Sequence, residues 1–154
     1  MNICLHDGPL AELETDALVW PLANGPSLGD AADQQIAALR QSGEVRGKPG
    51  ELTILHEPNG LQSRRLILLG VGDSLDATQA FRMTSQAVRA AQKRGYKRLV
   101  MALPDSNLVR AAVEGCVYGG YERPKYKSDD SVTPVEEVAI VAPGAEESVL
   151  KTGR

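Results

Sequence analysis

The sequence is poor in aromatic residues, histidine and cysteine, and it contains no long apolar run. Only 4% of its 154 residues are aromatic, and it has two histidines and two cysteines. The longest apolar stretches, such as LILL and VAIVA, are far too short to span a bilayer, so no contact with a membrane is predicted. The first residues show no basic segment followed by an apolar one, so no secretory signal is predicted either.

The few cysteines and histidines do not form a recognisable metal site. Cys4 and Cys116 are far apart and match no metal-binding spacing, so we expect buried, small hydrophobic residues in a reducing cytoplasm. His6 and His56 each fall in an expected strand without Asp, Glu or Cys at ligand spacing. We therefore expect structural or exposed histidines. The sequence assigns no catalytic, cofactor-binding or metal-binding residue.

The rest of the chain alternates between strand-like and helix-like segments. Apolar runs predict strands at 2–6, 16–22, 96–103 and 135–143, and a β-hairpin over 51–70 that turns at Pro58-Asn59-Gly60. Helices are expected at 30–43, from Asp76 to Gly95, and at 107–120, the last ended by Gly119-Gly120. This order predicts one domain of the α/β class, a three-layer α/β/α sandwich with a mixed sheet of about six strands. The most apolar strand, 64–70, is placed near the sheet centre.

Two glycine-containing segments have the composition of phosphate-binding loops. In LLGVGDS (68–74), Gly70 and Gly72 lie between a strand and a helix, but Leu75 stands where a dinucleotide-binding fingerprint has its third glycine. In RGKPGE (46–51), Lys48 could hold an anion. We expect tight turns in both places, with phosphate at the helix N-terminus as the alternative.

Charge is unevenly distributed along a chain whose net charge is −3. Acidic residues outnumber basic ones in 1–45 and 128–154, and basic residues outnumber acidic ones in 46–127. The preferred interpretation of the basic middle is a solvated helix face plus an interface. The alternative is a nucleic-acid contact surface along Arg89, Lys93, Arg94, Lys97 and Arg98.

The stretch YGGYERPKYKSDD (118–130) holds three of the four tyrosines, Tyr118, Tyr121 and Tyr126. Aromatic bodies bury well while their hydroxyl groups stay in contact with water, so this stretch suits contact with a neighbouring domain or subunit. We expect Tyr121 to pack under the loop. Stacking of nucleic-acid bases is a further alternative.

Five segments in the same order resemble the N-terminal domain of the leucyl aminopeptidase (cytosol aminopeptidase) family. They are TDALVWPL, GKPGE, RRLILLGVGD, the helix segment AFRMTSQAVRAA with Arg82 near its start, and the glycine-tyrosine stretch ending in Tyr126-Lys127-Ser128. The resemblance runs over nearly the whole chain. It implies that the tyrosine stretch is a structural connector between the last helix and the final strand, with Lys125 and Lys127 outside.

The resemblance also implies where catalysis takes place. Family members carry two divalent metals (zinc or manganese), a lysine and an arginine in a larger C-terminal domain marked by an Asn-Thr-Asp-Ala-Glu-Gly-Arg run. No such run occurs here. Residues 1–143 are expected to be the non-catalytic N-terminal domain and 144–154 the start of a linker helix. The expected partners are the catalytic domain and neighbouring subunits of a cytoplasmic homo-hexamer.

The N-terminal domain of this family has a macro-domain-like fold, which leaves a nucleotide- or ADP-ribose-binding module as an alternative function. The stretch DALVWPLANGPSLGD is similar to the ligand-binding stretch of macro domains. However, Trp20-Pro21 stand near the place of small residues and an asparagine, and the triple glycine is reduced to Gly29-Asp30. Asp30 would repel a diphosphate. Ligand binding is therefore not expected.

Overall fold

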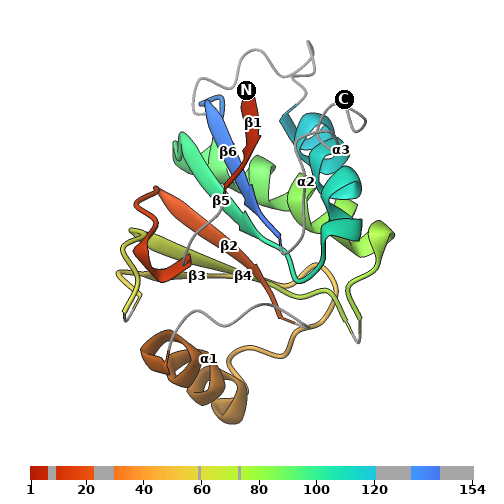
Figure 1. Cartoon of the computed structure of the whole chain (residues 1–154). Coiled ribbons are helices and arrows are strands. Elements are labelled where there is room, and N and C mark those ends of the chain that lie inside the picture. The colour runs from red at the N-terminus through yellow and green to blue at the C-terminus, as the bar shows by residue number, and fades with distance from the viewer. Residues whose placement is uncertain (7–9, 23–29, 59, 73, 121–132, 143–154) are drawn as a thin grey trace.

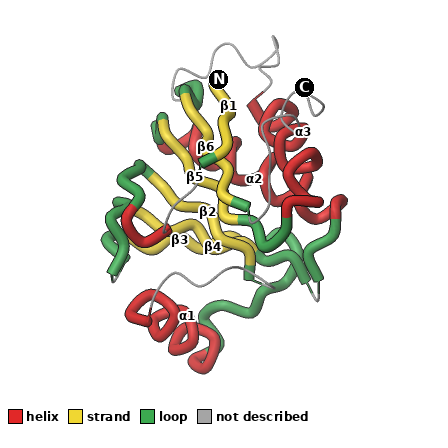
Figure 2. The backbone as a smooth tube through the Cα atoms, viewed as in Figure 1, coloured by secondary structure: helices red, strands yellow, loops and turns green. Residues whose placement is uncertain are grey.

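The computed structural model describes residues 1–6, 10–22, 30–58, 60–72, 74–120 and 133–142. In this part of the chain one sheet has helices on both faces (Figures 1 and 2). The strands are β1 (Asn2–Leu5), β2 (Ala17–Pro21), β3 (Leu52–His56), β4 (Arg65–Leu69), β5 (Arg98–Ala102) and β6 (Glu137–Val141). The helices are α1 (Asp30–Ser42), α2 (Ala77–Arg94) and α3 (Val109–Gly120), with single 3₁₀ turns at Leu10–Glu12 and Ser106–Leu108. No helix of the described part is both long and apolar enough to cross a bilayer.

Over the described residues the sheet is mixed and six-stranded, which confirms the predicted class. Its strand order is β1-β6-β5-β2-β4-β3, and every neighbouring pair is parallel except the antiparallel hairpin β3–β4. The prediction that the most apolar strand lies near the centre is wrong, because β4 is second from the edge. It is nevertheless fully buried from Leu66 to Leu69, because β3 shields its outer side and helices cover both faces.

Alternating side chains of the central strands build two hydrophobic layers. On β4, Ile67 and Leu69 pack toward α2 and α3, whereas Leu66 and Leu68 pack toward α1. In Figure 1, α1 lies below the sheet and α2 and α3 lie on its other side. A strand buried on both faces needs apolar residues at every position, as in a parallel sheet between helices. The predicted three-layer sandwich is therefore confirmed.

Helix α2 begins and ends where its sequence predicts. The Asp76 carboxylate accepts a hydrogen bond from the backbone N–H of Gln79 at 2.8 Å, which caps the N-terminus. Gly95 ends the helix with φ 76°, a left-handed conformation that glycine adopts without strain. The predicted apolar face is buried, from Ala80 and Met83 through Ala87 and Ala91.

Helix α3 packs closely against α2 through its glycines. A Cβ atom on Gly115 would lie 1.9 Å from the Thr84 hydroxyl oxygen, and one on Gly119 would lie 2.5 Å from the Ser85 carbonyl oxygen. Both glycines lie within α3, and the residues after Gly120 lie outside the described part of the chain, so the prediction that Gly119-Gly120 end this helix stays a prediction. At position 119 the missing side chain allows close contact between the helices.

A matched pair of substitutions in α3 tests this packing. Gly115→Ala should lower the free energy of unfolding by about 1–3 kcal/mol, because its methyl group would overlap the Thr84 hydroxyl and the α2 backbone. The control is Gly120→Ala, whose methyl group meets the flexible end of Met1 at 2.7 Å and should change stability by less than about 1 kcal/mol. Urea unfolding measures both. Equal midpoints for the two variants would contradict the close helix contact.

Candidate functional site

The carboxyl ends of the parallel strands are the first place to seek a site, because open α/β sheets bind ligands beyond these ends. Here the loop 46–51 lies against the segment that follows β4, and together they border a hollow of about 480 Å³. Three exposed cationic side chains line it, those of Arg40, Arg46 and Lys48. Asp76 also lines the hollow, so its described cations outnumber its acids by two and an anion is the ligand that its charge favours.

The backbone groups that an anion would need are already bonded within the chain. The N–H of Gly70 donates to the Glu51 carbonyl at 2.8 Å, and the N–H of Gly72 donates to the Gly47 carbonyl at 3.0 Å. The Gly70 carbonyl accepts from the N–H of Gly50 at 3.2 Å. A Cβ on Gly70 would lie 1.9 Å from the Lys48 carbonyl oxygen, so this glycine is required by the neighbouring loop. The turn interpretation of 46–51 is confirmed, because the Glu51 N–H also donates to the Lys48 carbonyl at 3.0 Å, whereas the turn expected in 68–74 includes position 73, which lies outside the described residues.

A carboxylate of the protein occupies two further donors of the loop. Glu51 Oε1 accepts from the backbone N–H groups of Arg46 and Gly47, both at 2.9 Å. Consecutive amides that converge in this way form an anion-binding concavity, and here an internal anion fills it. The Arg40 guanidinium donates to the Leu22 carbonyl. Lys48, which belongs to this loop, is exposed.

The macro-domain-like stretch contributes to the core. Trp20 is only 8% exposed and packs with Leu68 and Ile36 between the sheet and α1. Asp30 is the first residue of α1, and the loop that ends at Gly29 lies outside the described residues. The indole thus fills the layer beneath α1.

The histidines and cysteines are placed separately. His6 follows β1 and His56 ends β3, at opposite edges of the sheet, and both are exposed. Burial raises the pKa of the Cys116 thiol to about 12, although a hydrogen bond with Thr84 acts in the opposite direction. Cys116 is therefore a neutral, buried thiol, as predicted, whereas Cys4 is half-buried. Within the described ranges, no three His, Cys, Asp or Glu side chains lie close enough to share a metal ion.

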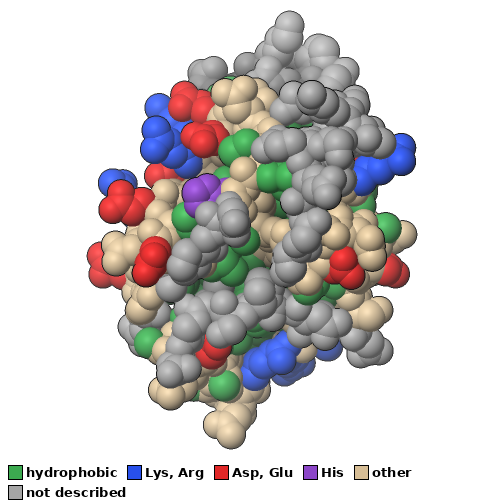
Figure 3. Space-filling view, in the orientation of Figure 1, with side chains coloured by type: hydrophobic (Ala, Val, Ile, Leu, Met, Phe, Trp, Pro, Cys, Tyr) green, Lys and Arg blue, Asp and Glu red, His purple; other side chains and the backbone are tan. Residues whose placement is uncertain are grey.

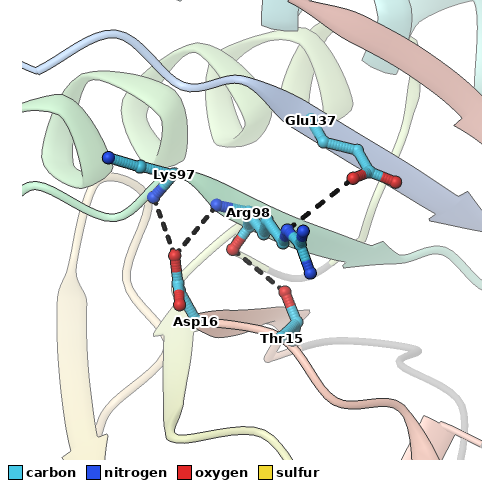
Figure 4. A network of polar contacts seen from close by, with 5 residues as sticks. All are labelled: Thr15, Asp16, Lys97, Arg98 and Glu137. Atoms are coloured by element: carbon cyan, nitrogen blue, oxygen red, sulfur yellow. Dashed lines mark hydrogen bonds and ion pairs between the residues drawn. The ribbon is translucent and has the colours of Figure 1, made fainter.

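The five cations proposed as a nucleic-acid surface divide between α2 and the start of β5. Asp16 accepts from the backbone N–H groups of Lys97 and Arg98, at 2.9 and 3.1 Å, and Glu137 lies 3.9 Å from the Arg98 guanidinium (Figure 4). The Thr15 hydroxyl donates to the Arg98 carbonyl at 2.9 Å. Carboxylates thus lie beside the backbone of Lys97 and Arg98 and beside the Arg98 side chain. In Figure 3, basic side chains on the visible face likewise occur in separate groups, with acidic ones beside the upper-left group.

The tyrosines divide between core and surface. Tyr96 is 6% exposed, with the Arg65 guanidinium 4.4 Å above its ring. Tyr118 is 50% exposed at the end of α3, and its ring centroid lies 5.4 Å from that of Phe81. The Arg89 guanidinium lies 5.0 Å from the same ring. The prediction that Tyr121 packs under the loop concerns 121–132, which lie outside the described residues, as do Lys125, Tyr126 and Lys127.

The fold and these loops define a class of three-layer α/β domains, and comparison with known proteins narrows it. Residues 14–130 match the sequence pattern of the cytosol aminopeptidase family, N-terminal domain. The chain is 32% identical over its whole length to a probable cytosol aminopeptidase of Solibacter usitatus, and 30% identical over 75% of its length to leucine aminopeptidase 1 of Arabidopsis thaliana. The chain belongs to the cytosol aminopeptidase family and corresponds to its N-terminal domain.

Solved structures agree on the fold. A mutant of tomato leucine aminopeptidase matches 99% of the chain with a TM-score of 0.75 at 18% identity, and the chain covers 35% of that protein. The bottromycin maturation enzyme BotP, solved in complex with Mn, matches 90% of the chain with a TM-score of 0.63 at 21% identity. The chain spans only about a third of the length of its first curated relatives, for example 33% of the Solibacter protein.

The occupied loop amides predict that the carboxyl edge does not bind a nucleotide diphosphate. Titration of the chain with ADP-ribose should show no binding tighter than about 10 μM, which corresponds to about −7 kcal/mol. Isothermal calorimetry at physiological salt measures this, and a macro domain that binds ADP-ribose serves as the positive control. Saturable binding below that concentration would contradict the assignment of Gly70 and Gly72 to a structural turn.

Proposed function

We propose that residues 1–143 act as the non-catalytic N-terminal domain of a metal-dependent leucyl-type aminopeptidase, an enzyme that removes N-terminal residues from peptides. The observation that carries the proposal is the share of a relative's length that the chain covers. The whole chain aligns with one third of a probable cytosol aminopeptidase, so two thirds of that relative's length lies beyond the match. In this proposal residues 144–154 begin the linker to the catalytic domain.

The chemistry of peptide hydrolysis supports placing the active site in that other domain. Two metal ions about 3.5–4 Å apart need several carboxylates converging on them, with a water positioned for attack on the carbonyl. The described residues offer no group of three His, Cys, Asp or Glu that could begin such a site. The two divalent metals, zinc or manganese, are therefore proposed to bind outside this domain.

The role left for this domain is assembly and control of access to the active site. Its exposed large hydrophobic side chains include Val117 and Tyr118 on the last turns of α3, at 55% and 50% exposure. Such side chains are typical of contact surfaces. We place them against the catalytic domain or a neighbouring subunit of a cytoplasmic homo-hexamer. The nucleotide-binding and nucleic-acid alternatives are not favoured, because the loop amides are occupied and carboxylates adjoin Arg98.

An activity and metal assay tests the proposal. The purified chain, incubated with zinc or manganese and leucine p-nitroanilide, should show no turnover above a blank of metal alone. After dialysis it should retain less than one metal ion per chain. The full-length Solibacter usitatus relative, assayed in the same buffer, is the positive control. Turnover by the chain, or two metal ions retained per chain, would place the active site here and overturn the proposal.

A further inference from the structure

An open groove of about 680 Å³ runs between the beginning of β3 and α2, and it borders the carboxyl-edge hollow at Pro49 and Gln79. Pro49, Gly50 and Leu52 form one side, and α2 forms the other. The Gln86 side chain donates to the Gly50 carbonyl at 2.8 Å and ties the two sides together. The groove therefore lies beside the start of β3, the edge strand of the described sheet.

The groove is positively charged on its α2 side. Its described lining residues include four exposed cations and no Asp or Glu. The four are Arg82, Arg89, Lys93 and Arg94. A partner that fills this groove would bury its own groups beside these cations, so carboxylates are the complementary groups.

Strand β3 lacks the usual protection of an edge strand. Natural edge strands carry charged side chains or proline, or are covered, which prevents pairing with another chain. The sequence of β3 is LTILH, without Lys, Asp, Glu or Pro, and Leu52 to Leu55 are half-buried. Among the described strands, its one neighbour in the sheet is β4. This edge is therefore suited to accept a further strand.

The hydrogen bonds to β4 show which backbone groups of β3 face outward. The Glu51 carbonyl accepts from Gly70, and the Glu57 N–H donates to the Arg64 carbonyl. In an antiparallel pair, successive residues direct their N–H and C=O groups alternately toward and away from the partner strand. The odd-numbered residues thus face β4, and the N–H and C=O groups of Leu52, Ile54 and His56 face away from it.

The outward-facing residues also lie on the charged side of the sheet. The side chains of Leu52 and Ile54 pack in the layer that contains α2. In an antiparallel strand pair, residues directly opposite share a face. Residues of an added strand that bond to Leu52 and Ile54 would therefore direct their own side chains toward the cations of α2.

We propose that β3 is a docking edge for an extended acidic peptide, which adds as an antiparallel strand and directs every second carboxylate toward α2. Main-chain hydrogen bonds supply affinity, and the alternating side chains supply specificity, as in other cases of strand addition. A second copy of the chain fits less well, because pairing across β3 would bring two sets of groove cations together. A nucleic acid would use the cations and leave the outward amides of β3 unpaired.

The test uses a fluorescently labelled peptide, Thr-Glu-Val-Glu-Val-Glu-Thr, blocked at both ends, and measures anisotropy with the full chain. Two further versions carry N-methyl groups, on the three Glu residues or on the two Val residues. The parent peptide should bind saturably. Methylation of Glu removes the donors opposite Leu52 and Ile54 and should abolish binding, whereas methylation of Val, whose amides face away, should preserve it.

Substitutions in the protein test the same contacts from the other side. Ile54→Pro removes one outward N–H without removing a bond to β4 and should weaken binding by about tenfold or more, whereas Ile54→Val should not. Arg82→Glu combined with Lys93→Glu should weaken it by about tenfold or more. Arg110→Glu changes an exposed charge that does not line the groove and is the matched control. Circular dichroism confirms that each variant is folded.

Three outcomes would overturn the proposal. The first is no binding of the parent peptide, and the second is equal binding of both methylated versions. The third is a DNA oligonucleotide of matched charge that competes equally well and binds the wild type and Ile54→Pro with one affinity, which would make the groove a nucleic-acid surface. The readout is binding alone. If the peptide does not bind, the proposed aminopeptidase role is unaffected. If the aminopeptidase proposal fails, the peptide-binding proposal is likewise unaffected.

Discussion

The close contact between α2 and α3 is the constraint on which the rest of this domain depends. At Gly115 and Gly119 the two helices approach at backbone distance, and the Ser85 hydroxyl donates to the Gly115 carbonyl at 3.0 Å. This contact closes one face of the sheet over Leu99 and Ile140. It also fixes the axis of α2, which supplies both the charged side of the β3 groove and the capped N-terminus beside the carboxyl-edge loops.

Much of the fold could be predicted because its signals are local. The unbroken apolar runs of β2 and β4 predicted strands buried on both faces, and Asp76 and Gly95 predicted the ends of α2. Strand order is not local. The position of β4 depends on β3 folding back as an edge strand, while β5 crosses to the far side of β2, and apolarity alone does not distinguish a central strand from a covered one. The packing role of Gly119 was not predicted for the same reason, because Ser85, which it contacts, lies in another helix.

The candidate site was less accessible to sequence reasoning. GKPGE and LLGVGD each resemble an anion-binding loop when taken alone, and their composition does not show that each supplies the hydrogen bonds of the other. The signal that could have indicated this is Glu51, an acid placed four residues after Gly47 and able to reach its amide. Likewise, the cations of α2 could be read from the sequence. Their relation to the free edge of β3 required the register of the hairpin.

Backbone hydrogen bonds join the loop 46–51 to the segment that follows β4, and we call this pair of bonded segments the clasp. The clasp affects local dynamics. Surface loops usually open at low free-energy cost, and their amide hydrogens exchange rapidly with solvent. Here the amides of Gly50, Gly70 and Gly72 are hydrogen-bonded across two loops, and Gly70 itself is fully enclosed. The clasp can open only if the hairpin and the segment entering α2 separate together. We therefore expect the buried amide of Gly70 to exchange as slowly as those of the sheet core, although this residue lies outside every described helix and strand.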